Sequence, residues 1–253
     1  MTLHPPCYVI SLAREVQKRR DFLERNRLTG LDFEVFEAID GNTLTGAESV
    51  RRGLIVAEAE GYTPGAIGVA ASHRDLWSKA IASERSLMVF EDDAYIRRDI
   101  LRQLRRLLST VPAWDIIMLG FNTDAVLDIR LSANINLVGS SPNRYPTADD
   151  LEIFSRETGP VVPVPLNNAM GAGGYLIAPS GARKLMSIFP LDNRTVVIPG
   201  NLSRYGTLAF RCVTFDMMWN TILPVMQAFM VVPPLALPLN NVASSTTKDL
   251  GQA

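Results

Sequence analysis

The stretch Ser86-Leu87-Met88-Val89-Phe90-Glu91-Asp92-Asp93 joins an apolar run of strand length to three consecutive acids. The run predicts a buried strand, and the abrupt change to acidic residues predicts that the strand ends there. In an open α/β sheet, ligands bind outside the carboxyl ends of the strands. The three acids are therefore expected to lie at a binding site on the edge of a sheet.

Three adjacent carboxylates repel one another, by on the order of 4 kcal/mol for a pair about 4 Å apart at an effective dielectric constant near 20. A cation, a raised pKa or full exposure to solvent would offset this repulsion. Glu91 and Asp93 point the same way in extended backbone. Two such hard oxygen ligands suit Mn²⁺ or Mg²⁺, which keep positions open for phosphate oxygens. The alternative is that Asp93 caps the following helix and that its neighbours are solvated.

Strands and helices are predicted to alternate on both sides of these acids. Apolar runs predict strands and apolar residues at helical spacing predict helices, in the order strand 7–12, helix 14–28, strand 33–39, helix 65–83, strand 86–90, helix 96–108, strand 114–120, strand 171–178 and a helix through 181–185. Helix 14–28 would bury Phe22, Leu23 and Leu28. The alternation predicts an α/β fold with a mostly parallel sheet flanked by helices.

The remaining segments and the composition limit the classes of protein. Residues 122–168 lack periodicity, which indicates a functional loop region or partial disorder. Residues 222–239 are apolar but interrupted by prolines, which favours a short helix and a buried strand over a membrane span. A net charge of −1 gives no bulk attraction to nucleic acid. Cys7 and Cys212 are expected to be reduced core residues of a cytosolic protein, and no secretory signal is recognised.

Four sequence motifs follow one another along the chain: residues 8–14 with Lys18-Arg19, residues 38–41, residues 65–73 with Trp77, and residues 91–93. Each motif alone is a weak signal, but their order and spacing make the set specific. A weaker fifth match lies at residues 175–185. Together they resemble glycosyltransferase family 25, the group of lipopolysaccharide-modifying and collagen-type galactosyltransferases. The resemblance covers most of residues 7–188. The chain departs from the family pattern at Ala66, Val69 and Ala71, where the family usually has Glu, Cys and Leu.

The resemblance implies a GT-A-like, Rossmann-related single domain over residues 1–253. Residues 7–120 would bind the nucleotide sugar, residues 121–243 would form the acceptor side, and residues 244–253 would be a flexible tail. It also implies a nucleotide-diphosphate sugar donor (UDP-galactose favoured), Mn²⁺ or Mg²⁺, and inversion at the anomeric carbon. Asp93 and Glu91 would hold the metal. The residues expected to contact the donor are Ser11, Leu12, Arg14, Arg19, His73, Glu91, Asp92, Gly173 and Gly174.

Several of these residues have a second interpretation. Arg14 and Arg19 could bind diphosphate through paired donors, or they could lie on a solvated helix face. His73 could contact the donor phosphate or the metal, or it could be a core histidine satisfied by hydrogen bonds. Gly173 and Gly174 precede a strand, which favours close approach of the backbone to the sugar over a phosphate cradle at a helix N-terminus.

Inverting transfer needs a base that takes a proton from the acceptor hydroxyl. Asp216, in the apolar run Thr214-Phe215-Asp216-Met217-Met218-Trp219, is the candidate, because an acid among apolar residues is expected to have a raised pKa. The alternative is that Asp216 caps a helix beginning near Met217.

The sequence therefore predicts a metal-dependent inverting transferase that moves a hexose to lipopolysaccharide or another glycan, on the cytoplasmic side of the inner membrane. Peripheral contact with an anionic, lipid-linked acceptor could come from Arg98, Arg102, Arg105 and Arg106, for which a solvated helix face is the alternative. One rival is a non-catalytic relative that binds sugar nucleotides and scaffolds or regulates glycan assembly. A metal-dependent phosphohydrolase is disfavoured, because no histidine-rich ligand set is present.

Overall fold

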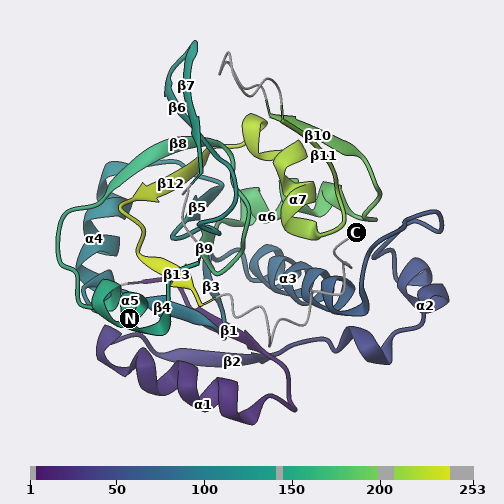
Figure 1. The fold of residues 1–253 in the computed structure, drawn as a ribbon, viewed down its shortest axis with the longest axis horizontal. Helices are drawn as coiled ribbons and strands as arrows, with labels where there is room; N and C mark the ends of the chain where they lie inside the picture. The colour runs from purple at the N-terminus through teal and green to yellow at the C-terminus, as the bar shows by residue number, and fades with distance from the viewer. Residues whose placement is uncertain (1–3, 141–144, 199–207, 240–253) are drawn as a thin grey trace.

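The computed structural model describes residues 4–140, 145–198 and 208–239. Nine strands form one central sheet in the order β2-β1-β3-β9-β5-β12-β8-β6-β7 (Figure 1). Their bounds are β1 Cys7–Ser11, β2 Phe33–Glu37, β3 Leu87–Glu91, β5 Ile116–Met118, β6 Leu127–Ser132, β7 Ile135–Gly139, β8 Val162–Asn168, β9 Gly174–Ile177 and β12 Ala228–Val232. Two small sheets pair β4 (Ala94–Ile96) with β13 (Ala236–Pro238), and β10 (Thr195–Ile198) with β11 (Leu208–Arg211).

Helices cover both faces of the central sheet, which confirms the predicted α/β, Rossmann-like fold. The helices are α1 Val16–Arg25, α2 Gly46–Arg51, α3 Pro64–Ser83, α4 Ile100–Thr110, α5 Ala148–Ser155, α6 Pro179–Leu185 and α7 Phe215–Met218. Short 3-10 turns lie at Arg27–Thr29, Gly41–Thr43, Met186–Ile188, Trp219–Thr221 and Leu223–Val225. Alternate residues of the central strands pack against α3, α6 and α7 on one face and against α1 and α4 on the other.

The direction of the strands gathers several chain segments at one edge of the sheet. β1 is parallel to β2 and β3, whereas β9 runs antiparallel to both β3 and β5. The sheet is therefore mixed, and the carboxyl ends of β1, β2, β3 and β5 share an edge with the amino end of β9. β9 belongs to the expected acceptor-side half and lies between two strands of the expected nucleotide-binding half. The two halves are thus interleaved in one sheet.

The first predicted helix is shorter than expected. It ends at Arg25 because the side chain of Asn26 turns back to the Phe22 carbonyl and bridges to Ala94 of β4. Phe22 is buried as predicted, but Leu23 and Leu28 are exposed, so the predicted buried face is wrong at those two positions. The helix predicted at 96–108 begins only at Ile100, since residues 94–96 pair with β13.

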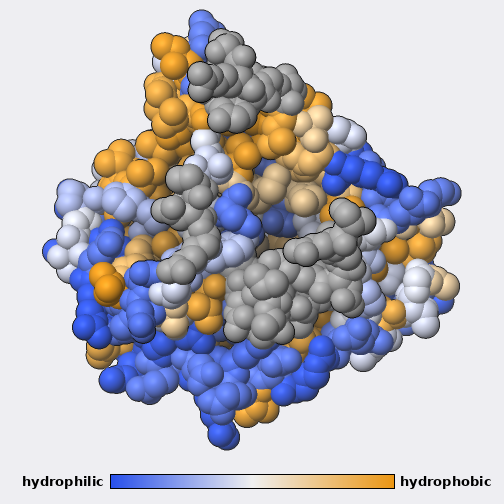
Figure 2. All heavy atoms as spheres, viewed as in Figure 1, coloured by the Kyte–Doolittle hydropathy of each residue, from blue (hydrophilic) through white to orange (hydrophobic). Residues whose placement is uncertain are grey.

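The region at 122–168 is more ordered than predicted, because it contains β6, β7, α5 and β8. Polar residues at some buried positions obscure the apolar pattern of these strands: Asp128 of β6 is buried and accepts a hydrogen bond of 3.0 Å from Asn168. The hairpin formed by β6 and β7 projects from the body of the protein (Figure 1) and exposes Leu131, Ile135 and Leu137. Figure 2 shows hydrophobic residues over this region and hydrophilic residues over α1 at the opposite end of the view.

Two predictions about apolar segments are tested by the fold. Residues 222–239 form a short 3-10 turn and the strands β12 and β13, and no helix within the described residues is long and apolar enough to cross a membrane. Cys7 and Cys212 are both free and buried, as predicted for core thiols. The tail at 244–253 lies outside the described residues.

The start of α3 packs directly on the backbone that follows β2. Thr63 caps α3 by accepting a hydrogen bond of 3.1 Å from the Ala66 N–H, and Pro64 occupies the first turn. A Cβ atom on Gly68 would lie 2.5 Å from the Ile39 carbonyl oxygen and 2.6 Å from the Gly41 nitrogen. Only glycine allows this approach, which fixes residues 38–41 against α3.

We expect Gly68→Ala to lower the free energy of unfolding by about 2–3 kcal/mol, because the added methyl must displace backbone atoms. Gly46→Ala is the matched control. A Cβ atom on Gly46 meets nothing within 4 Å, so this change should be neutral or slightly stabilising. Urea unfolding of both variants measures the difference, and equal midpoints would show that the α3 contact is not tight.

Candidate functional site

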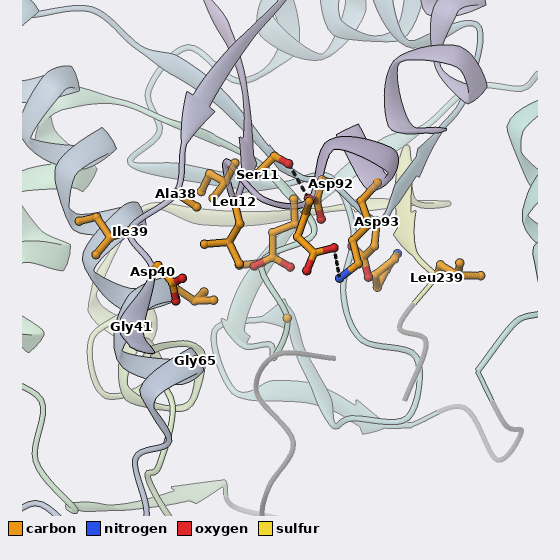
Figure 3. Close-up of a pocket in the computed structure, with 18 of the residues that line it drawn as sticks. Ser11, Leu12, Ala38, Ile39, Asp40, Gly41, Gly65, Asp92, Asp93 and Leu239 are labelled. Atoms are coloured by element: carbon orange, nitrogen blue, oxygen red, sulfur yellow. Dashed lines mark hydrogen bonds and ion pairs between the residues drawn. The ribbon is translucent and has the colours of Figure 1, made fainter. Parts of the chain in front are cut away.

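A pocket of about 460 Å³ lies at the shared edge of the sheet (Figure 3). Its lining comes from the carboxyl ends of β1, β2, β3 and β5, the amino side of β9, the first turn of α3, one face of α1, and the chain at α7 and β13. Figure 3 shows Ser11 and Leu12 at its centre, with Asp40 on one side and Asp92 and Asp93 on the other. The expected binding site at the strand ends thus coincides with a pocket.

All three acids of the triplet line this pocket. Asp92 accepts a hydrogen bond of 2.8 Å from the Ser11 hydroxyl, which ties the end of β3 to the end of β1. The Asp93 carbonyl accepts a bond of 3.1 Å from the Leu239 N–H. The chain continues from Asp93 into β4, and the next helix has Asp99 at its N-cap position. The interpretation of Asp93 as a helix cap is therefore wrong.

Glu91 is electrostatically strained, as its pKa shows. Its pKa is raised from 4.5 to about 8, chiefly by burial and further by the negative charges of Asp216 and Asp92. Burial also raises the pKa of Asp92, against the opposing effects of the Ser11 hydrogen bond and Lys18. Burial is the main cause of both shifts, and the charges of Asp216 and Asp92 add to that of Glu91, so these acids repel one another within the pocket.

Glu91→Gln is expected to make the metal-free protein more stable at alkaline pH. Because the folded pKa is raised, ionisation of Glu91 opposes folding: its cost is absent below about pH 4.5, grows as the pH rises toward 8, and is constant above. One pKa unit corresponds to about 1.4 kcal/mol. Since 31% of the side chain is exposed, we expect on the order of 2 kcal/mol at pH 9 and no difference at pH 4. Urea unfolding across this pH range in EDTA measures it, and parallel pH profiles would contradict the prediction.

Asp216 also lines the pocket, in the first turn of α7. Its carboxylate accepts a hydrogen bond of 2.8 Å from the Gly171 N–H and one of 2.5 Å from the Thr214 hydroxyl. Helix α7 begins at Phe215 with Thr214 at its N-cap position, so the interpretation of Asp216 as a cap for a helix near Met217 is wrong. The same acid is instead fixed between α7 and the loop before β9.

His73 lies on α3, is buried in the protein core and does not line the pocket. Its Nδ1 lies 2.7 Å from the Tyr175 hydroxyl, and its Nε2 lies 3.3 Å from Glu91 Oε1. Burial lowers the pKa of His73 to about 3, so it is neutral at ordinary pH. The core interpretation therefore describes its location, and His73 reaches the site through two residues that line the pocket, Glu91 and Phe215.

The cations at the pocket differ in part from those predicted. Arg14 lines the pocket and forms an ion pair with Asp40, whereas Arg19 donates to the Leu12 carbonyl and is not among the lining residues. Lys18 and Arg25 line the pocket instead. Sequence spacing could have found them, because residues 18, 21 and 25 share one face of α1.

Of the three glycines at or just before the start of β9, one lines the pocket and two are buried away from it. Gly171 lines the pocket and has a φ of +91°, and a Cβ there would collide with Asn122. Gly173 and Gly174 do not line the pocket: Gly174 packs against the Phe90 ring. Among the three departures from the family pattern, Val69 lines the pocket, and Ala66 and Ala71 are buried.

The four arginines expected to meet an anionic partner are partly neutralised. Arg98 pairs with Glu152 and Arg102 pairs with Asp99. Arg105 and Arg106 are exposed on α4.

The acids at the pocket wall would suit a cation whose coordination shell is completed by a bound ligand. Within residues 4–140, 145–198 and 208–239, no group of three or more His, Cys, Asp or Glu side chains is arranged to hold a metal ion. Mg²⁺ is usually bound through one or two carboxylates, with waters and substrate phosphates supplying the rest. Glu91 and Asp93 offer such oxygens at the pocket wall. The donor set therefore suits a metal-diphosphate complex better than a resident ion held by protein alone.

Comparison with known proteins gives a consistent result. The model of glycosyltransferase family 25 (LPS biosynthesis protein) matches residues 4–195. The inactive glycosyltransferase 25 family member 3 of Mus musculus is 33% identical over 127 residues, which is 45% of this chain and 21% of that protein. A glycosyltransferase 25 family member of Aedes aegypti is 26% identical over 198 residues, 73% of this chain and 28% of that protein. One from Anopheles gambiae is 30% identical over 128 residues, 45% of this chain and 21% of that protein. The chain thus spans only about a quarter of the length of these relatives.

Proposed function

Because the chain belongs to glycosyltransferase family 25, we propose that it transfers a hexose from a nucleotide-diphosphate sugar to a glycan acceptor, with inversion at the anomeric carbon. The observation that supports this most directly is the shared pocket: the acids that end β3 and the acid of α7 line the same cavity. UDP-galactose is the favoured donor, and a lipopolysaccharide or related glycan is the favoured acceptor.

Departure of the nucleotide diphosphate is the difficult step. Mn²⁺ or Mg²⁺ at Asp93, with Glu91, would neutralise the charge that develops on the leaving diphosphate. Arg14 and Lys18, on the α1 side of the pocket, would add charge-assisted hydrogen bonds to phosphate oxygens. Ser11 holds Asp92 in place from β1. The donor would thus be bound by its diphosphate, with the sugar left free to face the acceptor.

Asp216 would act as the base. Its carboxylate is fixed by Gly171 and Thr214, so it can take the proton of the acceptor hydroxyl as that oxygen bonds to the anomeric carbon. The bond between this carbon and the diphosphate oxygen breaks in the same step, and the electron pair leaves with the diphosphate. Such a single displacement inverts the anomeric carbon.

A second candidate function is supported by the names of the relatives. Family members from Mus musculus, Rattus norvegicus and Bos taurus are called inactive or probably inactive. A chain that binds the sugar nucleotide without turning it over could scaffold or regulate glycan assembly.

A donor screen by thermal shift, with and without Mn²⁺, tests the common part of both candidates. A nucleotide sugar at about 100 times its dissociation constant should stabilise the protein by about 2.7 kcal/mol. Release of the free nucleotide diphosphate, measured with a panel of glycan acceptors, then separates the transferase from the binder. If no nucleotide sugar stabilises the protein under either condition, the proposal fails.

A further inference from the structure

Three buried aromatic side chains form a hydrogen-bonded chain that ends on Glu91. The Trp77 indole nitrogen lies 3.0 Å from the Tyr175 hydroxyl, and that hydroxyl lies 2.7 Å from His73 Nδ1. His73 Nε2 lies 3.3 Å from Glu91 Oε1. Trp77, Tyr175 and His73 are each fully buried. A chain of polar groups in the core therefore connects to the wall of the pocket.

The direction of each hydrogen bond in this chain follows from the donor inventory. An indole N–H can only donate, so the Tyr175 oxygen accepts from Trp77. Tyr175 is fully buried, and an unpaired hydroxyl proton there would cost free energy, so the Tyr175 proton is assigned to its other neighbour, His73 Nδ1, which accepts it. A histidine that accepts at Nδ1 is neutral and carries its proton on Nε2. That proton faces Glu91 Oε1.

The His73 ring also supports the helix that carries Asp216. It stacks on the Phe215 ring at 4.5 Å between centroids and 25° between planes. Phe215 lines the pocket and precedes Asp216 in α7. The His73 ring therefore contacts Glu91, one of the two proposed metal ligands, and Phe215, the neighbour of the proposed base Asp216.

We propose that His73 is a positioning residue. Tyr175 and Trp77 hold His73 in the Nε2–H tautomer. In this state His73 orients the Glu91 carboxylate toward the pocket, and its stacking on Phe215 fixes the position of α7 relative to Glu91. A histidine that served only the core would bond with another core group, whereas His73 Nε2 bonds with an acid of the pocket wall. The kinetic consequence rests on the proposed function, but the tautomer and the hydrogen bonds do not.

The tautomer is directly measurable, because His73 and His4 are the only histidines in the chain. In ¹⁵N-histidine-labelled protein at pH 9, His73 should show one protonated nitrogen, Nε2, and an unprotonated Nδ1. The signals that disappear in His73→Gln are those of His73, which assigns them. Tyr175→Phe, which removes only the hydroxyl, should shift His73 toward the other tautomer. An Nδ1–H tautomer or a doubly protonated ring in the wild type would overturn the proposal without any need for a variant.

A pair of substitutions at His73 separates positioning from packing. Gln can keep an N–H near the position of Nε2, whereas Leu has a similar volume and no donor. His73→Leu should raise the Mn²⁺ concentration for half-maximal donor binding by about 10–100-fold, and His73→Gln by much less. Equal losses in the two variants would leave only a packing role and overturn the proposal. If the wild type binds no donor, the proposed function fails, and the tautomer still decides this inference.

Discussion

Replacing Asp93 by Asn is expected to lower the rate of nucleotide release by about 100-fold or more, and to abolish the stabilisation of the protein by donor and Mn²⁺ together. The amide is nearly the same size but is a poor ligand for a hard cation, so the diphosphate loses the charge that offsets its departure. The backbone hydrogen bond from Leu239 to the Asp93 carbonyl does not involve the side chain. Because the amide is nearly isosteric with the carboxylate, the fold should be retained. Nucleotide release across a Mn²⁺ titration measures the effect.

Asp149→Asn is the matched control for this variant. Asp149 is an exposed acid in the first turn of α5 and does not line the pocket. The same chemical change there should leave donor binding and turnover unaltered. If Asp93→Asn kept wild-type Mn²⁺ dependence, the proposed metal position would be wrong. If it lost donor binding and also unfolded, as judged by circular dichroism, Asp93 would be a structural residue.

The site was predicted best where a local pattern reports a strand end. The change from Phe90 to Glu91 marks both the end of β3 and the pocket wall, since a buried strand cannot continue as three carboxylates. Asp216 could also be identified from the sequence, as an acid within an apolar run. Its partner could not, because the Gly171 N–H reaches it only through the fold.

The parts that were missed depend on contacts between distant segments. Lys18 and Arg25 line the pocket because α1 packs beside β4, an arrangement fixed by the side chain of Asn26. The order of the sheet depends on β9, which inserts antiparallel between β3 and β5. Local apolar patterns report that a strand is buried, but they do not report its neighbours or its direction.

Replacing Asp216 by Asn is expected to lower kcat by about 10²–10⁴-fold, with little change in donor affinity, because the acceptor hydroxyl loses its base. The substitution is conservative in structure. The Asn oxygen can still accept from the Gly171 N–H, and its amide can donate to the Thr214 hydroxyl in place of the bond that the carboxylate accepts. Thermal shift measures donor affinity. The rate of transfer to the acceptor that the screen identifies measures kcat.

Thr214→Val is the control that separates a base from a merely well-placed acid. It removes only the hydroxyl that donates to Asp216, so the carboxylate remains and retains the Gly171 contact. We expect a loss below about tenfold, since one hydrogen bond contributes about 1 kcal/mol. A large fall in Asp216→Asn together with a small one in Thr214→Val identifies the carboxylate itself as the proton acceptor. Similar small losses in both would move the base to another group in the pocket and leave Asp216 as the residue that orders the loop before β9.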